Sequence, residues 1–224
     1  MVTTETKYLS CAETAKLVRA ALHKNFPGVK FTARSDVYSG GASIDVRWVL
    51  GPTTKEVDAI AGRYESASFD GSIDMETSYS HWLKPDGDAT IESGPGTEGS
   101  MGYIPKVEPQ PQPEGAVKVH FGAHYVSCQR SLTENYRDEM DLRRQVARDM
   151  CELQRIEYKG DNTVGLFGAG DSEQVDQHAW RLLDATHFDP GEVYAGVRYE
   201  KEGEKREEIL NGFQVPFVIL KKKA

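Results

Sequence analysis

The chain has 224 residues, of which 38% are hydrophobic, and its 35 acidic and 27 basic side chains give a formal net charge of −8. This length fits one large domain or two small ones, and the apolar content supports a folded core and excludes bulk disorder. No apolar run approaches the roughly 18 residues of a membrane-spanning helix, and three widely spaced cysteines indicate a reducing compartment rather than a disulfide framework.

The N-terminal stretch predicts a helix. Ser10 and Glu13 have the spacing of a capping box, and an apolar stripe follows, so we expect a helix over residues 11–25. The residues before it, MVTTETKYLS, lack the basic and apolar regions of a secretory signal. We therefore expect a cytoplasmic protein.

A β-hairpin and a second helix come next. Residues 29–37 and 44–50 alternate between apolar and polar side chains, as half-buried strands do, around a glycine-rich turn at 39–41. Thr53 and Glu56 form another capping box, followed by an apolar helical face. We expect that face to pack on the hairpin.

The rest of the first half predicts further strands. In residues 68–75, Phe69 and Ile73 share one parity with Met75, while Asp70 shares the other with Asp74, which favours a third strand. Residues 78–83 continue this strand or form an edge.

Residues 84–115 are rich in Gly, Pro and acids and have no sustained period. This composition predicts a linker or a long surface loop.

The second half predicts strands and two helices. Residues 116–128 alternate as one strand, and Ser131 and Glu134 form a capping box for a helix that reaches residue 154. A further helix starts at Asp171 or Ser172. Strands at 193–199 and 213–219 close the chain.

These elements predict an α+β fold of two halves, each an antiparallel sheet with packed helices. The expected division is a domain over residues 1–83, an acidic Pro/Gly-rich linker or loop over 84–115, and a domain over 116–224. Whether the halves are independent, and the oligomeric state, are left open by the sequence.

The negative charge is concentrated in the middle of the chain. Residues 51–115 hold twelve acids and four bases, whereas the remainder holds twenty-three of each. Such a segment attracts basic surfaces and repels nucleic acid, or it is a solvated face kept for solubility.

Three groups of residues are candidates for metal or phosphate chemistry. His120, His124 and Cys128 are residue types that bind zinc, but on a strand residues four apart lie about 13 Å from each other, too far to share one ion. We expect them to lie on a polar face, lining a groove at most. The second group is a set of aspartates that a nuclease would use for Mg²⁺, Asp45, Asp70 and Asp74, although polar strand faces carry such residues routinely. The third group is a set of glycines before a helix start that could hold phosphate, Gly165, Gly168 and Gly170, although flexible loops are also rich in glycine.

The hairpin's polar face carries the candidates for nucleic-acid contact. Arg34, Tyr38 and Arg47 lie on it, but Asp36 and Asp45 beside them offset the charge. We assign no catalytic, cofactor-binding or metal-binding residue and expect no cofactor.

Several segments resemble a known family. The opening KYLSCAETAKLVRAAL, the motif YSGGASIDVRW at residues 38–48, and the later FDGSID and YVSCQRSL are similar to a large polyvalent protein-associated domain carried by phages, plasmids and integrative elements. The resemblance implies a mobile-element accessory protein in a bacterial cytoplasm, of a group suspected of protecting incoming DNA or disabling host defences. It supplies no catalytic residues.

The sequence thus leaves three functional hypotheses. The first is a non-enzymatic, anti-CRISPR or anti-restriction inhibitor that binds a host or element-encoded protein with a basic surface through the acidic segment. The second is a nucleic-acid-binding protein that uses the hairpin, and the third is a metal-dependent nuclease or hydrolase. No membrane partner is expected.

Overall fold

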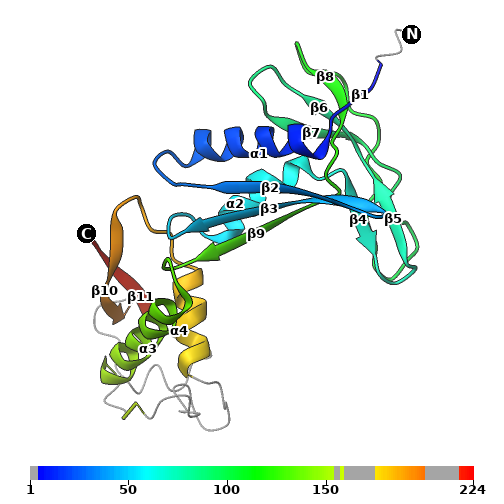
Figure 1. Ribbon diagram of the computed structural model, residues 1–224. Coiled ribbons are helices and arrows are strands. Elements are labelled where there is room, and N and C mark those ends of the chain that lie inside the picture. Colours follow the sequence, from blue (N-terminus) through cyan, green and yellow to red (C-terminus); the bar gives the residue numbers. More distant parts are fainter. Residues whose placement is uncertain (1–4, 154–156, 159–174, 200–216) are drawn as a thin grey trace. The chain divides into compact units, whose positions relative to one another are not determined.

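The computed structural model describes residues 5–153, 157–158, 175–199 and 217–224 (Figure 1). These residues form four α-helices and eleven β-strands, which confirms the predicted α+β class. The chain divides into two compact units, Met1–Trp48 with Thr54–Arg130 and Val49–Thr53 with Ser131–Ala224. This division differs from the predicted boundaries at residues 83 and 115.

The first helix, α1 (Cys11–Asn25), begins where the sequence predicts. The Ser10 hydroxyl accepts from the Glu13 N–H at 3.2 Å, and the Glu13 carboxylate accepts from the Ser10 N–H at 2.8 Å, so both halves of the capping box are present. Burial falls on one stripe of the helix that includes Val18 and Leu22. The apolar residues form one stripe because they recur at helical spacing, and this stripe packs against the sheet.

We expect the Ser10→Ala substitution to destabilise the first unit by about 1 kcal/mol, because it removes the side-chain acceptor at the start of α1. Chemical denaturation measures the change. Ser127→Ala, at an exposed strand position, is the matched control and is expected to stay within about 0.5 kcal/mol of the wild type. Equal stabilities of the two variants would contradict the capping role.

The predicted hairpin is also present, as β2 (Thr32–Tyr38) and β3 (Gly41–Val49). The two strands pair antiparallel in one continuous register, from Thr32 opposite Arg47 to Tyr38 opposite Gly41. Gly40 adopts a φ of 93°, which a residue with a side chain rarely does. Helix α2 (Thr54–Ala61) and the 3₁₀ helix η1 (Gly62–Tyr64) follow.

Two larger sheets organise the first unit. One has the order β2-β3-β9, where β9 is Tyr125–Ser131. The other has the order β1-β8-β6-β7. Its strands are Lys7–Tyr8 (β1), Ser80–Leu83 (β6), Ala89–Ser93 (β7) and Val117–His120 (β8). Since β1 pairs parallel with β8, this sheet is mixed, whereas a purely antiparallel sheet was predicted.

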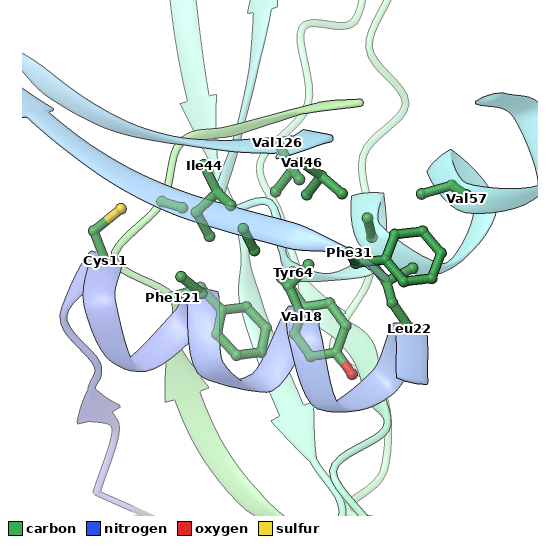
Figure 2. Packing of buried hydrophobic residues seen from close by; sticks show 14 of the residues in the cluster. Cys11, Val18, Leu22, Phe31, Ile44, Val46, Val57, Tyr64, Phe121 and Val126 are labelled. Carbon is green, nitrogen blue, oxygen red and sulfur yellow. The ribbon is translucent and has the colours of Figure 1, made fainter. Parts of the chain in front are cut away.

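The core of the first unit joins α1, the hairpin, α2 and the chain around residue 121 (Figure 2). The rings of Tyr64 and Phe121 lie 5.3 Å apart at its centre, and the Tyr64 hydroxyl donates to Gly87 O at 2.8 Å. Burial of this hydroxyl raises the pKa of Tyr64 to about 12. Figure 2 labels ten of the packed residues: Cys11, Val18, Leu22, Phe31, Ile44, Val46, Val57, Tyr64, Phe121 and Val126.

The predicted strand over residues 116–128 is broken into β8 and β9. The break contains Gly122, whose N–H donates to the Thr14 hydroxyl at 3.1 Å. A Cβ on Gly122 would lie 2.4 Å from Leu9 O and 2.5 Å from Cys11 N. The chain leaves one sheet and enters the other at this close approach, which alternation alone does not reveal.

Residues 84–115 lie within the first unit. They contain β7, which pairs with β6, and the Trp82 indole N–H donates to Gln110 O at 3.0 Å. The Gln110 N–H in turn donates to Glu92 O at 2.8 Å. The Gly- and Pro-rich sequence of this segment has no apolar period, but its backbone groups still form hydrogen bonds with the rest of the unit.

The second unit has its own core. Helices α3 (Tyr136–Leu153) and α4 (Val175–Asp184) pack with the antiparallel pair β10 (Glu192–Tyr199) and β11 (Phe217–Lys223). Its buried residues are Leu132, Val146, Ala147, Met150, Cys151, Ala179, Leu183, Phe188, Val197, Phe217 and Ile219.

The start of α3 corrects a prediction. Ser131 is the last residue of β9, and its carbonyl accepts from the Leu50 N–H at 2.8 Å. The cap is instead Asn135, whose side-chain oxygen accepts from the Asp138 N–H at 3.0 Å. The expected helix start at Asp171 or Ser172 lies outside the described residues, as do positions 213–216 of the last predicted strand.

Candidate functional site

The segment predicted as a third strand forms a tight hairpin instead. Strands β4 (Ala67–Asp70) and β5 (Met75–Ser78) pair antiparallel, with Phe69 opposite Glu76. Figure 1 shows this hairpin at the same end of the first unit as the β2–β3 turn.

The hairpin turn is fixed by Asp70. Its carboxylate accepts from the Ser72 N–H at 3.0 Å and from the Ser72 hydroxyl at 2.7 Å, the arrangement of an Asx turn. The side chain is almost fully buried, at 1% exposure. The sequence Asp70-Gly71-Ser72 carries this turn signal, and the strand-like parity around it obscured it.

A second segment is held against the turn. The Ser100 hydroxyl donates to the Asp70 carboxylate, and the Gly102 N–H donates to the Ser72 hydroxyl at 3.0 Å. The Ile104 N–H donates to the Thr97 hydroxyl at 2.9 Å within the same loop. The hydrogen bonds that Asp70 accepts from Ser100, and to a smaller extent from Ser72, hold the pKa of its carboxyl well below its usual range. The Asp70 carboxylate is therefore charged at neutral pH.

These two segments present large apolar side chains to solvent. Phe69 is 54% exposed, Ile73 50%, Met75 41%, Met101 98% and Tyr103 59%. We call these five residues the hairpin patch. Phe69 lies opposite Glu76 and Met75 opposite Asp70 in the register, so these two side chains point to different faces of the hairpin. Single exposed apolar residues are ordinary, whereas a group of five on two bonded segments is a candidate contact surface.

The surroundings of the hairpin patch are acidic. Residues 65–83 and 94–105 hold five carboxylates and no lysine or arginine. On the hairpin, Glu76 accepts from the Tyr125 hydroxyl at 2.7 Å and lies 3.1 Å from Nδ1 of His124. Burial, followed by the bond to Glu76, raises the pKa of Tyr125 to about 12, so that hydroxyl remains a donor.

Much of the other acidic surplus is paired inside the first unit. Lys118 binds Glu92 at 2.7 Å, and Arg63 binds Asp88 at 3.1 Å. Further pairs are Lys24–Asp86, Lys84–Asp88 and Lys106–Glu108. Acids near the hairpin patch, such as Asp74 and Glu98, are exposed and lack such partners among the described residues. The surface that attracts basic groups is therefore narrower than the whole segment 51–115.

A concave site of about 400 Å³ lies between α1, η1 and the turn at residues 84–88. Lys24, Arg63, Asp86 and Asp88 line it, and they neutralise one another in the ion pairs just described. The site therefore presents no uncompensated charge to a ligand.

The structure does not bring His120, His124 and Cys128 together. His120 Nδ1 lies 3.2 Å from Tyr79 O, and His124 contacts Glu76. Burial, then the bond to Asp58, raises the pKa of the Cys128 thiol well above its usual range, which disfavours the thiolate that binds metal. Within the described residues no group of three or more His, Cys, Asp or Glu side chains could hold a metal ion.

The three aspartates proposed for Mg²⁺ are also separate. Asp45 pairs with Arg47 at 2.7 Å, Asp70 accepts the hydrogen bonds from Ser72 described above, and Asp74 lies in the β4–β5 turn with a φ of 52°. The glycines at 165, 168 and 170 lie outside the described residues.

Aspartates lie beside both arginines of the predicted nucleic-acid face. The Arg47–Asp45 pair occupies one of its two arginines, and Arg34 lies opposite Asp45 in the strand register. Tyr38 is 47% exposed at the turn.

No helix in the described parts of the chain has the length and apolar character needed to cross a membrane. The model of one protein family, described as large polyvalent protein associated domain 29, matches residues 9–133. This match covers α1, the β2-β3-β9 sheet, the hairpin patch and all strands of the other large sheet except β1. No curated protein and no solved structure matches the chain.

Proposed function

Because the chain belongs to the family of large polyvalent protein associated domain 29, we propose that it is an accessory protein of a phage or plasmid that works by binding another protein. Membership associates the chain with phages and mobile elements. The hairpin patch is the observation that supports binding, since five large apolar side chains are exposed to solvent on two segments that hydrogen bonds hold together.

The partner in this proposal carries a basic surface around an apolar pocket. Phe69 and Met101 supply apolar anchors of the kind that dominate binding energy, and the acids around them attract lysine and arginine. Proteins that handle nucleic acid in host defence, such as restriction and CRISPR nucleases, present basic surfaces of this kind. The chain would occupy such a surface in the host cytoplasm without catalysing a reaction.

The double substitution Phe69→Ser and Met101→Ser tests this function. We expect it to weaken partner binding by at least roughly 30-fold, because each residue is placed as an interface anchor. Its stability should stay within about 0.5 kcal/mol per site, as both side chains are exposed. Co-purification from host lysate with mass spectrometry identifies the partner, and plating of phage on cells with and without restriction or CRISPR immunity measures the effect.

The control for this experiment is Tyr136→Ser, at a residue that is 78% exposed in the second unit and outside the hairpin patch. It is expected to bind and protect as the wild type does. The proposal fails if wild-type bait recovers no defence component and leaves both kinds of immunity unchanged. It also fails if the double variant protects as well as the control.

A further inference from the structure

Strand β2 is at the edge of the β2-β3-β9 sheet. An edge strand carries a row of backbone N–H and C=O groups that point away from its own sheet, and such a row can pair with another strand. The hydrogen-bond register with β3 determines which backbone N–H and C=O groups of β2 point outward.

The two-residue turn at 39–40 makes Tyr38 and Gly41 a hydrogen-bonded pair. Because hydrogen-bonded and non-bonded pairs alternate along an antiparallel ladder, Thr32, Arg34 and Asp36 also direct their backbone groups to β3. The groups of Ala33, Ser35 and Val37 therefore point outward. The Arg19 guanidinium confirms this direction, because it donates to Ala33 O from outside the sheet at 2.6 Å.

Beyond Ala33 the edge is open. Among the residues that the structure describes, nothing bonds to the outward backbone groups of Ser35 and Val37. All side chains from Arg34 to Tyr38 are exposed, and Val37 is 73% exposed although it is apolar.

The charges on this edge are self-complementary. Arg34 and Asp36 flank Ser35, and neither has an ion-pair partner in the described part of the chain. If two copies of β2 run antiparallel with the Ser35 residues opposite each other, each Arg34 lies opposite an Asp36 of the other copy. Centring the pair on Arg34 or on Asp36 would instead oppose like charges.

We propose that two copies of this chain pair through β2 in this register, joining their two sheets into one. A two-fold axis through the Ser35 pair makes the interface self-complementary, as a closed dimer requires. The outward groups of Ser35 form the central hydrogen-bonded pair. Val37 lies opposite Ala33 of the second copy, where the Ala33 N–H is open to the Val37 carbonyl and the Ala33 carbonyl keeps its bond to Arg19.

Charge reversal tests the register. Arg34→Glu alone and Asp36→Lys alone each place like charges opposite one another at both ends of the interface, so each is expected to raise the Kd of the dimer by roughly 30-fold. An equimolar mixture of the two variants restores opposite charges at both positions. We expect the mixture to form a heterodimer with a Kd close to that of the wild type.

Sedimentation equilibrium over a range of protein concentrations measures the Kd values of the wild type, the two variants and their mixture. Circular dichroism checks that each variant is folded. A wild type that stays monomeric at the highest soluble concentration overturns the proposal and leaves the edge to a strand of another protein. A dimer that both single variants form unchanged places the interface elsewhere. Weakening without recovery in the mixture overturns the register.

Discussion

Replacing Gly122 by alanine is expected to destabilise the first unit by about 3 kcal/mol or more, at the upper end of what overpacking costs. The added Cβ would lie 2.4–2.5 Å from backbone atoms of Leu9, Ser10 and Cys11. Backbone at the start of a capped helix cannot rotate away as a flexible side chain does. Relief therefore requires α1 or the β8–β9 connection to move.

Hydrogen exchange of amides in α1 and β8 measures this loss locally, which matters because a chain of two units need not unfold in one step. Gly62→Ala is the matched control. A Cβ there meets only the end of the Glu65 side chain at 3.9 Å, and alanine favours a helical turn, so this variant is expected to be as stable as the wild type or more so. Equal protection in the two variants would show that the contact at Gly122 is not tight.

Acidification from pH 6.5 to pH 4 is expected to cost the first unit up to about 3 kcal/mol through His81 alone. His81 is 1% exposed, and its ring lies 4.8 Å from the Phe121 ring. Its Nδ1 has no hydrogen-bond partner within the described chain. Burial, and then the nearby His120, lower the pKa of His81 to about 4.

The direction follows from proton binding. The unfolded chain protonates His81 near pH 6.5, whereas the folded chain keeps it neutral down to about pH 4. Between these values the unfolded state binds more protons than the folded state. The stability that depends on neutral His81 is therefore fully present above pH 6.5 and decreases as the pH falls to about 4.

Denaturation at several pH values compares the wild type with His81→Leu, in which an apolar side chain of similar size replaces the titratable imidazole. The variant is expected to lose most of the slope between pH 6.5 and 4, while the protection of second-unit amides shows the same pH dependence in both proteins. An unchanged slope in the variant would mean that other groups cause the acid sensitivity.

Sequence reasoning succeeded where structure depends on neighbours along the chain. The capping box of Ser10 and Glu13 and the alternation on either side of Gly40 specify α1 and the β2–β3 hairpin, because hydrogen bonds within four residues and a period of two decide them. The cap at Asn135 was not predicted, because Ser131 is the last residue of β9 and its carbonyl is bonded to the N–H of Leu50, far away in the sequence.

The acidic surplus of residues 51–115 was a property of the sequence, as was the resemblance that the family match confirms. The hairpin patch was not. Phe69 and Ile73 have the parity of a buried strand face, but the turn residues after Asp70 are exposed, and the bonds from Ser100 and Gly102 hold a second segment against them. Residues that are close together in the sequence determine local hydrogen bonds and the alternation of side chains, so the sequence alone predicts both. Contacts between segments thirty or more residues apart determined the docking of residues 100–102 on the turn at Asp70 and the break at Gly122.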